Sequence, residues 1–359
     1  MKGLARENII IDNTQQSLRI LIYLPGKEAF ILHLQLHMKV ESSTTIRIGS
    51  SSGKVEVDLL KCEPLKWQGL GSPLDNHLWF GPTQVLVLIL KLRVDISCWK
   101  DLALTYRDWT VTSITPITHD TKHIELQPPP GTVFSVPTGH HVHIKGVVEG
   151  GVEISRSYTP VTLFQSIRSR SRLDLLVKIY PDGALTPQLG QLCPGKAVSV
   201  SDHTGTYSQA HLAHTSTIYL LAAGTGCTPV FSLLAHLAQS RAAIPTILLF
   251  FNKTLADIIW QEELAELQSC QPWLSVVHVL SEETGEGWDG ERGRVRKDLL
   301  GKYIEKAKEG SFAAVCGPKG FTVESDRLLK EEYLFQEEQI HLFQGWLVSI
   351  SRTIVFIIV

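Results

Sequence analysis

The sequence lacks the patterns by which several classes of protein are identified directly. None of its six cysteines forms a Cys-x-x-Cys pair, so the sequence indicates neither a disulfide framework nor a zinc knuckle, and a reducing cytosol suits it best. It contains no Gly-x-x-x-x-Gly-Lys-Ser/Thr motif, which argues against a phosphate-binding P-loop. The net charge of only −2 argues against nucleic acid as the main partner.

Long apolar runs are also scarce. Residues 85–90 are apolar, but Lys91 interrupts the run, and the apolar tail 346–359 contains Arg352. Each is shorter than the roughly 20 residues that a helix needs to span a bilayer. Residues 1–16 lack the apolar core of a signal peptide. We therefore expect no transmembrane helix, a cytoplasmic protein and a buried strand at 85–90, while the tail stays unassigned.

What is present is a globular composition, with 43% apolar and 19% charged residues, and a length of 359 residues that predicts two or three domains. The first part, residues 9–70, is predicted to be an all-β sandwich, because turn-forming residues separate its β-rich runs. These runs are 18–23, 29–38, 44–48 and 54–60. No catalytic pattern stands out here, so we interpret this part as a binding or spacer module. Residues 71–105 form a connector of mixed character.

The pattern then changes twice. Over residues 106–214, short strands divided by Gly and Pro turns predict a small antiparallel β-barrel. Its strands are expected at 108–115, 123–126, 140–147, 173–180 and 197–201. Over residues 215–345, strands alternate with helices, which predicts a parallel, doubly wound sheet with its ligand at the carboxyl ends of the strands. The strands are expected at 217–223, 246–251, 274–280, 311–316 and 339–343, and the helices at 230–239, 257–268, within 295–308 and at 321–333.

A glycine-rich turn, Gly224-Thr225-Gly226-Cys227-Thr228-Pro229, joins the first strand and helix of this last part. Bare glycines let a ligand approach the backbone, and the start of a helix offers free N–H groups and a positive dipole end. The turn therefore suits a pyrophosphate or a dinucleotide. A plain strand-to-helix connection explains the same residues equally well.

Two features of the barrel suit an anionic cofactor. In Arg156-Ser157-Tyr158-Thr159-Pro160, the guanidinium can bind two phosphate oxygens, the ring can lie along a flat cofactor, and the Thr159 hydroxyl can bond to a ring nitrogen. The segment Gly183-Ala184-Leu185-Thr186-Pro187 predicts a turn and a helix start with further N–H donors. Lys178 and Tyr180 can face the same ligand. Structural explanations stay open for both segments: a surface arginine beside a core tyrosine, and an ordinary helix start.

Two features of the α/β part favour a nicotinamide dinucleotide. Asp257 follows the second strand, where a carboxylate can accept hydrogen bonds from a ribose 2′-hydroxyl and would repel a 2′-phosphate, which favours NADH. Asp257 fits equally well as the N-cap of the helix that follows, and one carboxylate can fill both roles. Cys316-Gly317-Pro318 ends the fourth strand and is expected beside the glycine turn, although a buried structural thiol is the ordinary role of a single cysteine.

A histidine cluster, His140, His141 and His143, is the one pattern that would suit a metal. In a strand His141 and His143 share a face, but no carboxylate or cysteine nearby in the sequence completes a ligand set. We therefore expect no metal site.

Taken in order, the segments RSYTP, KIYPDGALTPQL, LLAAGTGCTPV, FFNKTLADIIWQEEL and VCGP resemble the ferredoxin-reductase superfamily, specifically the NADH–cytochrome b5 reductases. The resemblance covers about residues 106–343. Residues 55–70 resemble the end of a CS domain, the small β-sandwich of co-chaperones. Some members of the family join a cytochrome b5 haem domain, a CS domain and the reductase, and the segments ITHDT and FNKT are similar to these members.

The resemblance implies an FAD-dependent NADH oxidoreductase that passes electrons to a haem acceptor such as cytochrome b5. Its FAD site would be held by Arg156, Tyr158 and Thr159 and completed by Lys178, Tyr180, Gly183, Ala184, Leu185 and Thr186.

The same resemblance implies an NADH site on the other side. Gly224 and Gly226 would leave room for NADH, and Thr228 would approach the flavin. Asp257 would select NADH, and Cys316, Gly317 and Pro318 would border the nicotinamide. Thr159 and Cys316 are the residues implied nearest to the reacting atoms.

The sequence departs from the family in four places. It has no His-Pro-Gly-Gly haem motif, the front of its CS-like part is shortened, the linker at 76–104 does not resemble the family, and the chain continues beyond Phe343 as an apolar tail. We therefore expect a separate cytochrome b5-like acceptor, a protein partner for the CS-like part, and association with the endoplasmic reticulum. The alternative is a non-enzymatic interaction protein whose reductase half is impaired.

Overall fold

The computed structural model describes residues 5–24, 28–48, 55–63, 71–74, 104–161, 172–240, 243–284 and 287–343. The chain divides into two compact units. The first comprises Met1–Thr110, Leu126–Pro137 and Ile167–Leu173, and the second comprises Val111–Glu125, Thr138–Ser166 and Asp174–Val359. Most of the predicted connector 71–105, including the run 85–90, and the whole tail 346–359 lie outside the described residues.

The first unit contains two antiparallel sheets, as the sequence predicts. The larger has the order β6-β3-β2-β1-β9, and the smaller is the pair β4–β5. The strands are β1 (Ile9–Asn13), β2 (Ser17–Leu24), β3 (Glu28–Leu36), β4 (Val40–Ile48), β5 (Val55–Lys61), β6 (Gly71–Pro73) and β9 (Thr132–Val133). Alternate residues of β1 and β2, such as Ile9, Ile11 and Ile20, pack with Val40 and with Val57 of the small sheet. The period of two along each strand therefore builds a sandwich core.

The opposite face of β1 carries a buried ion pair. The Arg107 guanidinium donates from Nε to Asp12 Oδ1 at 2.5 Å and from Nη2 to Asp12 Oδ2 at 2.7 Å. Arg19 Nη1 approaches the same carboxylate at 3.3 Å. Burial raises the pKa of Asp12, but the hydrogen bond and charge of Arg107, together with Arg19, outweigh it and the pKa is lowered. This carboxylate therefore links β1 to Arg19 of β2 and to Arg107, at the start of strand β7 (Tyr106–Pro116).

An antiparallel sheet follows, with the order β11-β10-β13-β7-β8-β12. Its strands are β7 (Tyr106–Pro116), β8 (Thr121–Gln127), β10 (Val142–Val148), β11 (Val152–Tyr158), β12 (Leu173–Lys178) and β13 (Ala197–Ser201), with the short helix α2 (Thr186–Gly190) after β12. Gly150 and Gly151, both with positive φ, make the tight connection between β10 and β11. The predicted barrel strand 173–180 ends at Lys178, so Tyr180 lies in the turn beyond it.

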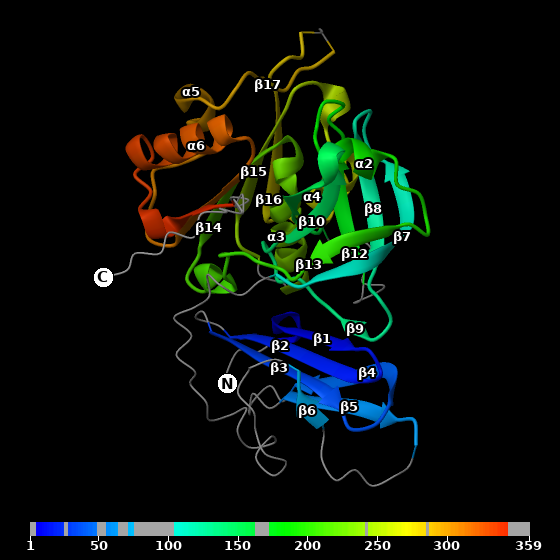
Figure 1. Cartoon of the computed structure of the whole chain (residues 1–359). Coiled ribbons are helices and arrows are strands. Elements are labelled where there is room, and N and C mark those ends of the chain that lie inside the picture. The colour runs from blue at the N-terminus through cyan, green and yellow to red at the C-terminus, as the bar shows by residue number, and fades with distance from the viewer. Residues whose placement is uncertain are drawn as a thin grey trace, which may run out of the picture. The chain divides into compact units, whose positions relative to one another are not determined.

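The last part is a parallel sheet with the order β17-β16-β15-β14-β18-β19. Its elements are β14 (Thr217–Ala223), α3 (Cys227–Ser240), β15 (Thr246–Asn252), α4 (Gln261–Cys270), β16 (Leu274–Leu280), β17 (Glu291–Arg292), α5 (Lys297–Leu300), β18 (Ser311–Cys316), α6 (Lys319–Glu331) and β19 (Ile340–Leu342). Figure 1 shows α3 and α4 on one side of the sheet and α5 and α6 on the other. The doubly wound fold is confirmed.

Successive side chains of the central strands point to opposite faces of the sheet and therefore pack against both helix layers. Leu220 and Phe250 pack in the cluster with α3 and α4, whereas Leu221 and Leu249 pack in the cluster with α5 and α6. Since both faces are covered, β14 is buried and apolar almost throughout.

Two helices differ from the prediction. The helix expected at 257–268 begins only at Gln261, because Trp260 before it has a left-handed backbone with φ of 54° and its ring stacks on Phe231 at 5.4 Å. Within 295–308 only Lys297–Leu300 is α-helical. Among the described residues, no helix combines the length and apolar character needed to cross a membrane.

Candidate functional site

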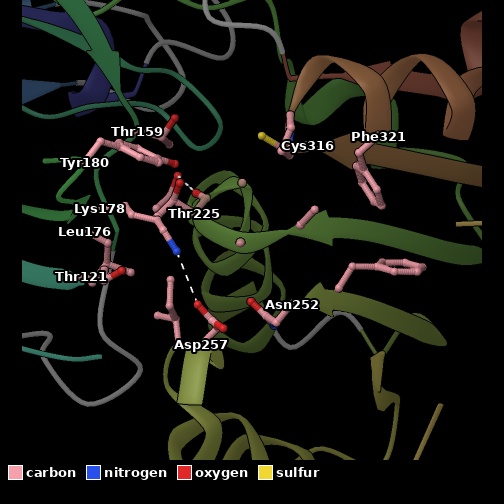
Figure 2. Close-up of a pocket in the computed structure, with 18 of the residues that line it drawn as sticks. Thr121, Thr159, Leu176, Lys178, Tyr180, Thr225, Asn252, Asp257, Cys316 and Phe321 are labelled. Atoms are coloured by element: carbon pink, nitrogen blue, oxygen red, sulfur yellow. Dashed lines mark hydrogen bonds and ion pairs between the residues drawn. The ribbon is translucent and has the colours of Figure 1, made fainter. Parts of the chain in front are cut away.

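A cleft of about 1930 Å³ lies in the second unit, lined by the antiparallel sheet on one side and by the carboxyl ends of the parallel strands on the other (Figure 2). Pockets for one small ligand are usually about 300–1,000 Å³, so this cleft has room for two cofactors. It brings together every residue that the sequence predicts for the site: Arg156, Tyr158, Thr159, Lys178, Tyr180, Gly183, Ala184, Leu185, Thr186, Gly224, Gly226, Thr228, Asp257, Cys316, Gly317 and Pro318.

The glycine turn forms the floor of the cleft between β14 and α3. A Cβ at Gly224, where φ is 52°, would meet no atom within 4 Å, so the space above this backbone is open. A Cβ at Gly226 would lie 2.5 Å from the Cys316 carbonyl oxygen, so a side chain is excluded there by the end of β18. Gly224 thus gives a ligand access to the backbone, and Gly226 allows the turn to pack closely against the end of β18. The predicted position of Cys316 beside the turn is confirmed.

The antiparallel sheet presents Arg156 and Tyr158 from the end of β11. The exposed Arg156 guanidinium donates to the Ser155 carbonyl at 2.8 Å. Burial raises the pKa of Tyr158 to about 12, so its hydroxyl stays neutral at physiological pH. An exposed cation and a half-buried neutral ring from the same strand can serve different parts of one ligand.

The turn after β12 is held by the Thr186 hydroxyl. Thr186 Oγ1 accepts from the Tyr180 N–H and lies within hydrogen-bonding distance of the Tyr180 carbonyl, both at 3.1 Å. A Cβ at Gly183 would come within 2.5 Å of the same oxygen. The hydroxyl therefore closes the turn, and the Tyr180 side chain projects from it, 52% exposed.

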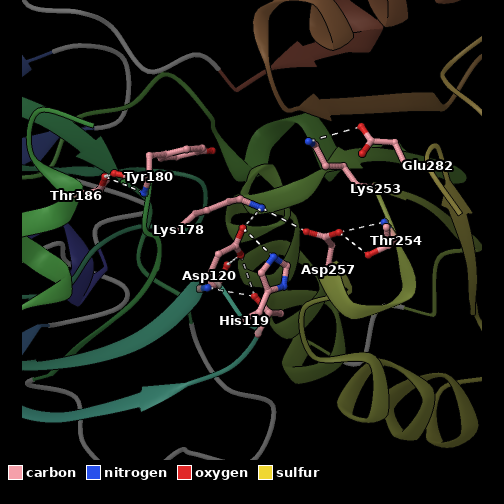
Figure 3. A network of polar contacts seen from close by, with 11 residues as sticks. His119, Asp120, Lys178, Tyr180, Thr186, Lys253, Thr254, Asp257 and Glu282 are labelled. Carbon is pink, nitrogen blue, oxygen red and sulfur yellow. Dashed lines mark hydrogen bonds and ion pairs between the residues drawn. The ribbon is translucent and has the colours of Figure 1, made fainter. Parts of the chain in front are cut away.

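Charged groups gather at one end of the cleft (Figure 3). Lys178 Nζ lies 2.7 Å from Asp120 Oδ2 and 3.5 Å from Asp257 Oδ1. Burial lowers the pKa of Lys178, but the hydrogen bond and charge of Asp120 and the charge of Asp257 outweigh it, so the pKa is raised. Lys178 thus stays charged and links the antiparallel sheet to the loop after β15.

Asp257 has a second set of partners. Its Oδ2 accepts from the Thr254 N–H at 3.0 Å and from the Thr254 hydroxyl at 2.7 Å. Burial raises the pKa of Asp257, but these hydrogen bonds and the Lys178 charge outweigh it, and the pKa is lowered. The alternative that Asp257 caps the following helix is wrong, because Asp257 ends the 3-10 turn Leu255–Asp257 and α4 begins four residues later.

The opposite end of the cleft is less polar. Cys316 ends β18, paired with Ala222, and burial raises the pKa of its thiol to about 12. The thiol is therefore protonated and unsuited to act as a nucleophile. Phe251 and Phe321 make an edge-to-face ring contact of 5.1 Å and also line the cleft.

Asn252 and Asp120 line the cleft although sequence reasoning missed both as site residues. Asn252 is the last residue of β15 and is only 6% exposed, and neither atom of its amide has a hydrogen-bond partner among the described residues. The signal for Asn252 was its place: a polar residue at the carboxyl end of an apolar parallel strand.

Two groups of side chains among the described residues lie close enough to share an ion: His119, Asp120 and Asp257, and His123, Glu125 and Asp174. The Lys178 ammonium already lies between the two carboxylates of the first group. In the second, His123 Nε2 lies 3.1 Å from Asp174 Oδ1.

The predicted histidine cluster is arranged around a hydroxyl. His141 Nε2 lies 3.0 Å from Thr204 Oγ1 and His143 Nε2 lies 3.4 Å from it. Burial, with the neighbouring histidines, lowers the pKa of His141 to about 4, and burial also lowers the pKa of His143. These rings are neutral, hydrogen-bonded side chains.

Two family models match the chain. The model described as an oxidoreductase FAD-binding domain matches residues 108–208, and the model described as an oxidoreductase NAD-binding domain matches residues 220–326. The two halves of the cleft come from these two matched regions.

Among the relatives, cytochrome b5 reductase 4 of Danio rerio is 34% identical over 344 residues, and that of Homo sapiens is 33% identical over 352 residues. The alignments cover 94% and 95% of this chain but only 62% and 64% of the relatives, so the chain spans less than two thirds of their length. A solved structure of the CS-b5R domains of human Ncb5or in the NAD+ form is 33% identical, with a TM-score of 0.83. That match covers 96% of this chain and 94% of the solved chain.

Proposed function

The chain belongs to the cytochrome b5 reductase family of FAD- and NAD-binding oxidoreductases, and from this premise we propose that it transfers electrons from NADH to a haem protein of the cytochrome b5 type. The observation that carries the proposal is the single cleft that RSYTP enters from one side and GTGCTP from the other. The alternative of a non-enzymatic interaction protein is not favoured, because both cofactor-binding regions match their family models.

The side chains of the cleft fit two nucleotide cofactors. The exposed Arg156 supplies positive charge for a phosphate, and the space above Gly224 is open to a ligand. The buried amide of Asn252 has no hydrogen-bond partner in the part of the chain that the structure describes, so a polar group of a ligand can satisfy it. Bound FAD supplies a carrier that accepts two electrons from a dihydronicotinamide and releases them one at a time.

On the FAD side, Arg156 pairs with the diphosphate, and Tyr158 and Thr159 contact the flavin ring. Lys178, Tyr180 and the turn from Gly183 to Thr186, including Ala184 and Leu185, complete this side. The reaction needs the two rings in register, so the main task of these residues is to hold and orient them. The Thr186 contacts with the Tyr180 backbone support that role because they fix the turn.

On the NADH side, Gly224 and Gly226 form the floor and Thr228 reaches toward the flavin. Asp257 accepts hydrogen bonds from the ribose and repels a 2′-phosphate. Cys316, Gly317 and Pro318 border the nicotinamide. The raised pKa of Cys316 fits a neutral, space-filling thiol in that place.

We further propose a cytosolic protein that associates with the endoplasmic reticulum and binds a protein partner through its CS-like unit. The family resemblance supports this setting. Cell fractionation with the full chain, and with a chain lacking the tail 346–359, checks the membrane association.

The function is tested by following the reduction of ferricyanide and of purified cytochrome b5 with NADH or NADPH. We expect turnover with both acceptors and a preference for NADH. Arg156→Ala should lose bound flavin and therefore activity, whereas Lys145→Ala, which removes an ion pair with Glu153 away from the cleft, should retain both. Flavin-loaded wild-type protein that oxidises no NADH would contradict the proposal.

A further inference from the structure

Asn252 is a polar side chain of the cleft whose amide has no hydrogen-bond partner among the described residues. Its backbone is fully engaged: it pairs with Leu280 in β16, and its carbonyl accepts from the Ser281 N–H at 3.0 Å. Its amide nitrogen and oxygen, in contrast, are buried and have no partner among the described residues. Burying a donor and an acceptor without partners destabilises a fold, so such a group in a cleft indicates a ligand that supplies the missing bonds.

The position of Asn252 in the sheet indicates which part of a dinucleotide it meets. The strand β14 lies between β15 and β18, and the glycine turn stands at its end. A dinucleotide whose diphosphate crosses this turn extends toward β18 with one half and toward β15 with the other. Cys316 ends β18, and the proposed function assigns the nicotinamide half to that side. Asn252 and Asp257 therefore face the adenosine half.

The surroundings of Asn252 suit a nucleoside. Phe251 precedes it in β15 and also lines the cleft, and Asp257 follows in the next loop (Figure 2). A nucleoside combines a flat apolar base with hydroxyl and ring groups that both donate and accept. A primary amide offers the same pair of functions.

We propose that the Asn252 side chain is a binding residue for the adenosine half of the dinucleotide, to which its amide donates one hydrogen bond and from which it accepts another. The inference rests on the proposed function, since it assumes that the cleft binds NADH. Asp257 Oδ2 already accepts two hydrogen bonds from Thr254, so it is mainly Oδ1, 3.5 Å from Lys178 Nζ, that remains to accept from the ribose. Asn252 therefore adds affinity for the adenosine half, and the charge of Asp257 adds discrimination against a 2′-phosphate.

A ligand-binding role and a structural role predict opposite effects on stability. If Asn252 serves the ligand, the nearly isosteric Asn252→Leu removes an unsatisfied buried group, and the ligand-free protein melts at the same or a higher temperature. If an ordered water satisfies the amide in the free protein, the same change lowers the melting temperature.

The test uses flavin-loaded full-length protein and measures binding of NAD+, AMP and nicotinamide mononucleotide by calorimetry, with a thermal melt of each variant. Two neutral hydrogen bonds predict that Asn252→Leu weakens NAD+ and AMP about 10- to 30-fold. Binding of nicotinamide mononucleotide should not change. Asn252→Ala, a smaller side chain, should weaken the same two ligands. Thr246→Val, a buried hydroxyl at the other end of β15, is the matched control and should change only stability.

Unchanged NAD+ affinity in both Asn252 variants would overturn the inference, and so would a loss confined to nicotinamide mononucleotide. Wild-type protein that binds no NAD+ would contradict the proposed function itself. The two failures are therefore distinguished by the wild-type titration.

Discussion

Two aspartates in this chain, Asp12 and Asp257, both contact basic side chains, but only Asp257 lines the cleft. In the first unit, Asp12 receives a two-point hydrogen bond from Arg107 and a third contact from Arg19, and none of the three lines the cleft. In the second unit, Asp257 contacts Lys178 and Thr254 at the edge of the cleft. The pKa of each carboxyl is lowered, so the shift by itself does not distinguish a structural group from a binding group. The distinguishing observation is that Asp257 lines the cleft and Asp12 does not.

The largest expected effect is the loss of stability when the structural aspartate, Asp12, is replaced. Asp12→Asn leaves two buried guanidinium groups facing a neutral amide, and removing one partner of a buried ion pair costs about 3–5 kcal/mol of unfolding free energy. Chemical denaturation of the full chain measures it. Glu56→Gln, which removes a partner from the exposed Arg47, is the matched control and should cost less than about 1 kcal/mol. Equal losses in the two variants would contradict a special role for Asp12.

Lowering the pH should also weaken the fold by protonating Asp12. The folded-state pKa of Asp12 is lowered, so its contribution to stability is complete above the pKa of about 3.9 that it has in an unfolded chain. The contribution is lost as the pH falls below that value toward the folded pKa. Hydrogen exchange of β1 and β2 between about pH 3 and 6 should show this loss in the wild type and a much weaker pH dependence in Asp12→Asn.

A smaller effect is expected at the second aspartate. Asp257→Ser removes the charge that would repel a 2′-phosphate, so the ratio of kcat/KM for NADPH to that for NADH should rise by about tenfold, which corresponds to about 1.4 kcal/mol. Because Asp257 lies at the edge of the cleft, we expect its loss to change the melting temperature less than that of Asp12. An unchanged cofactor ratio would refute its role in selecting NADH.

The sequence predicted the parts of this molecule that depend on neighbouring residues. The glycine turn follows an apolar strand, so the local pattern predicted a strand-to-helix turn that suits a dinucleotide, and the family resemblance then assigned roles to Gly224, Gly226 and Thr228. The parallel order of β14, β15 and β16 followed from alternating strands and helices.

The contacts between distant residues could not be predicted in the same way. Asp12 and Arg107 are 95 residues apart, and Lys178 and Asp257 are 79 residues apart. No local pattern encodes such pairs. The pairing of β9 with β1 is equally distant, so the sequence placed residues 132–133 in a barrel whereas they join the sheet of the first unit. Asn252 was missed for another reason: its significance is that its amide has no partner among the described residues, which only the packed structure reveals.

The central claim is that one cleft holds a flavin on one side and NADH on the other. The most direct measurement is the visible absorbance spectrum of the purified full-length protein during an oxygen-free titration with NADH. A yellow protein whose flavin band is bleached by about one equivalent of NADH per chain is the predicted result. A colourless protein that cannot be reconstituted with FAD would contradict the account.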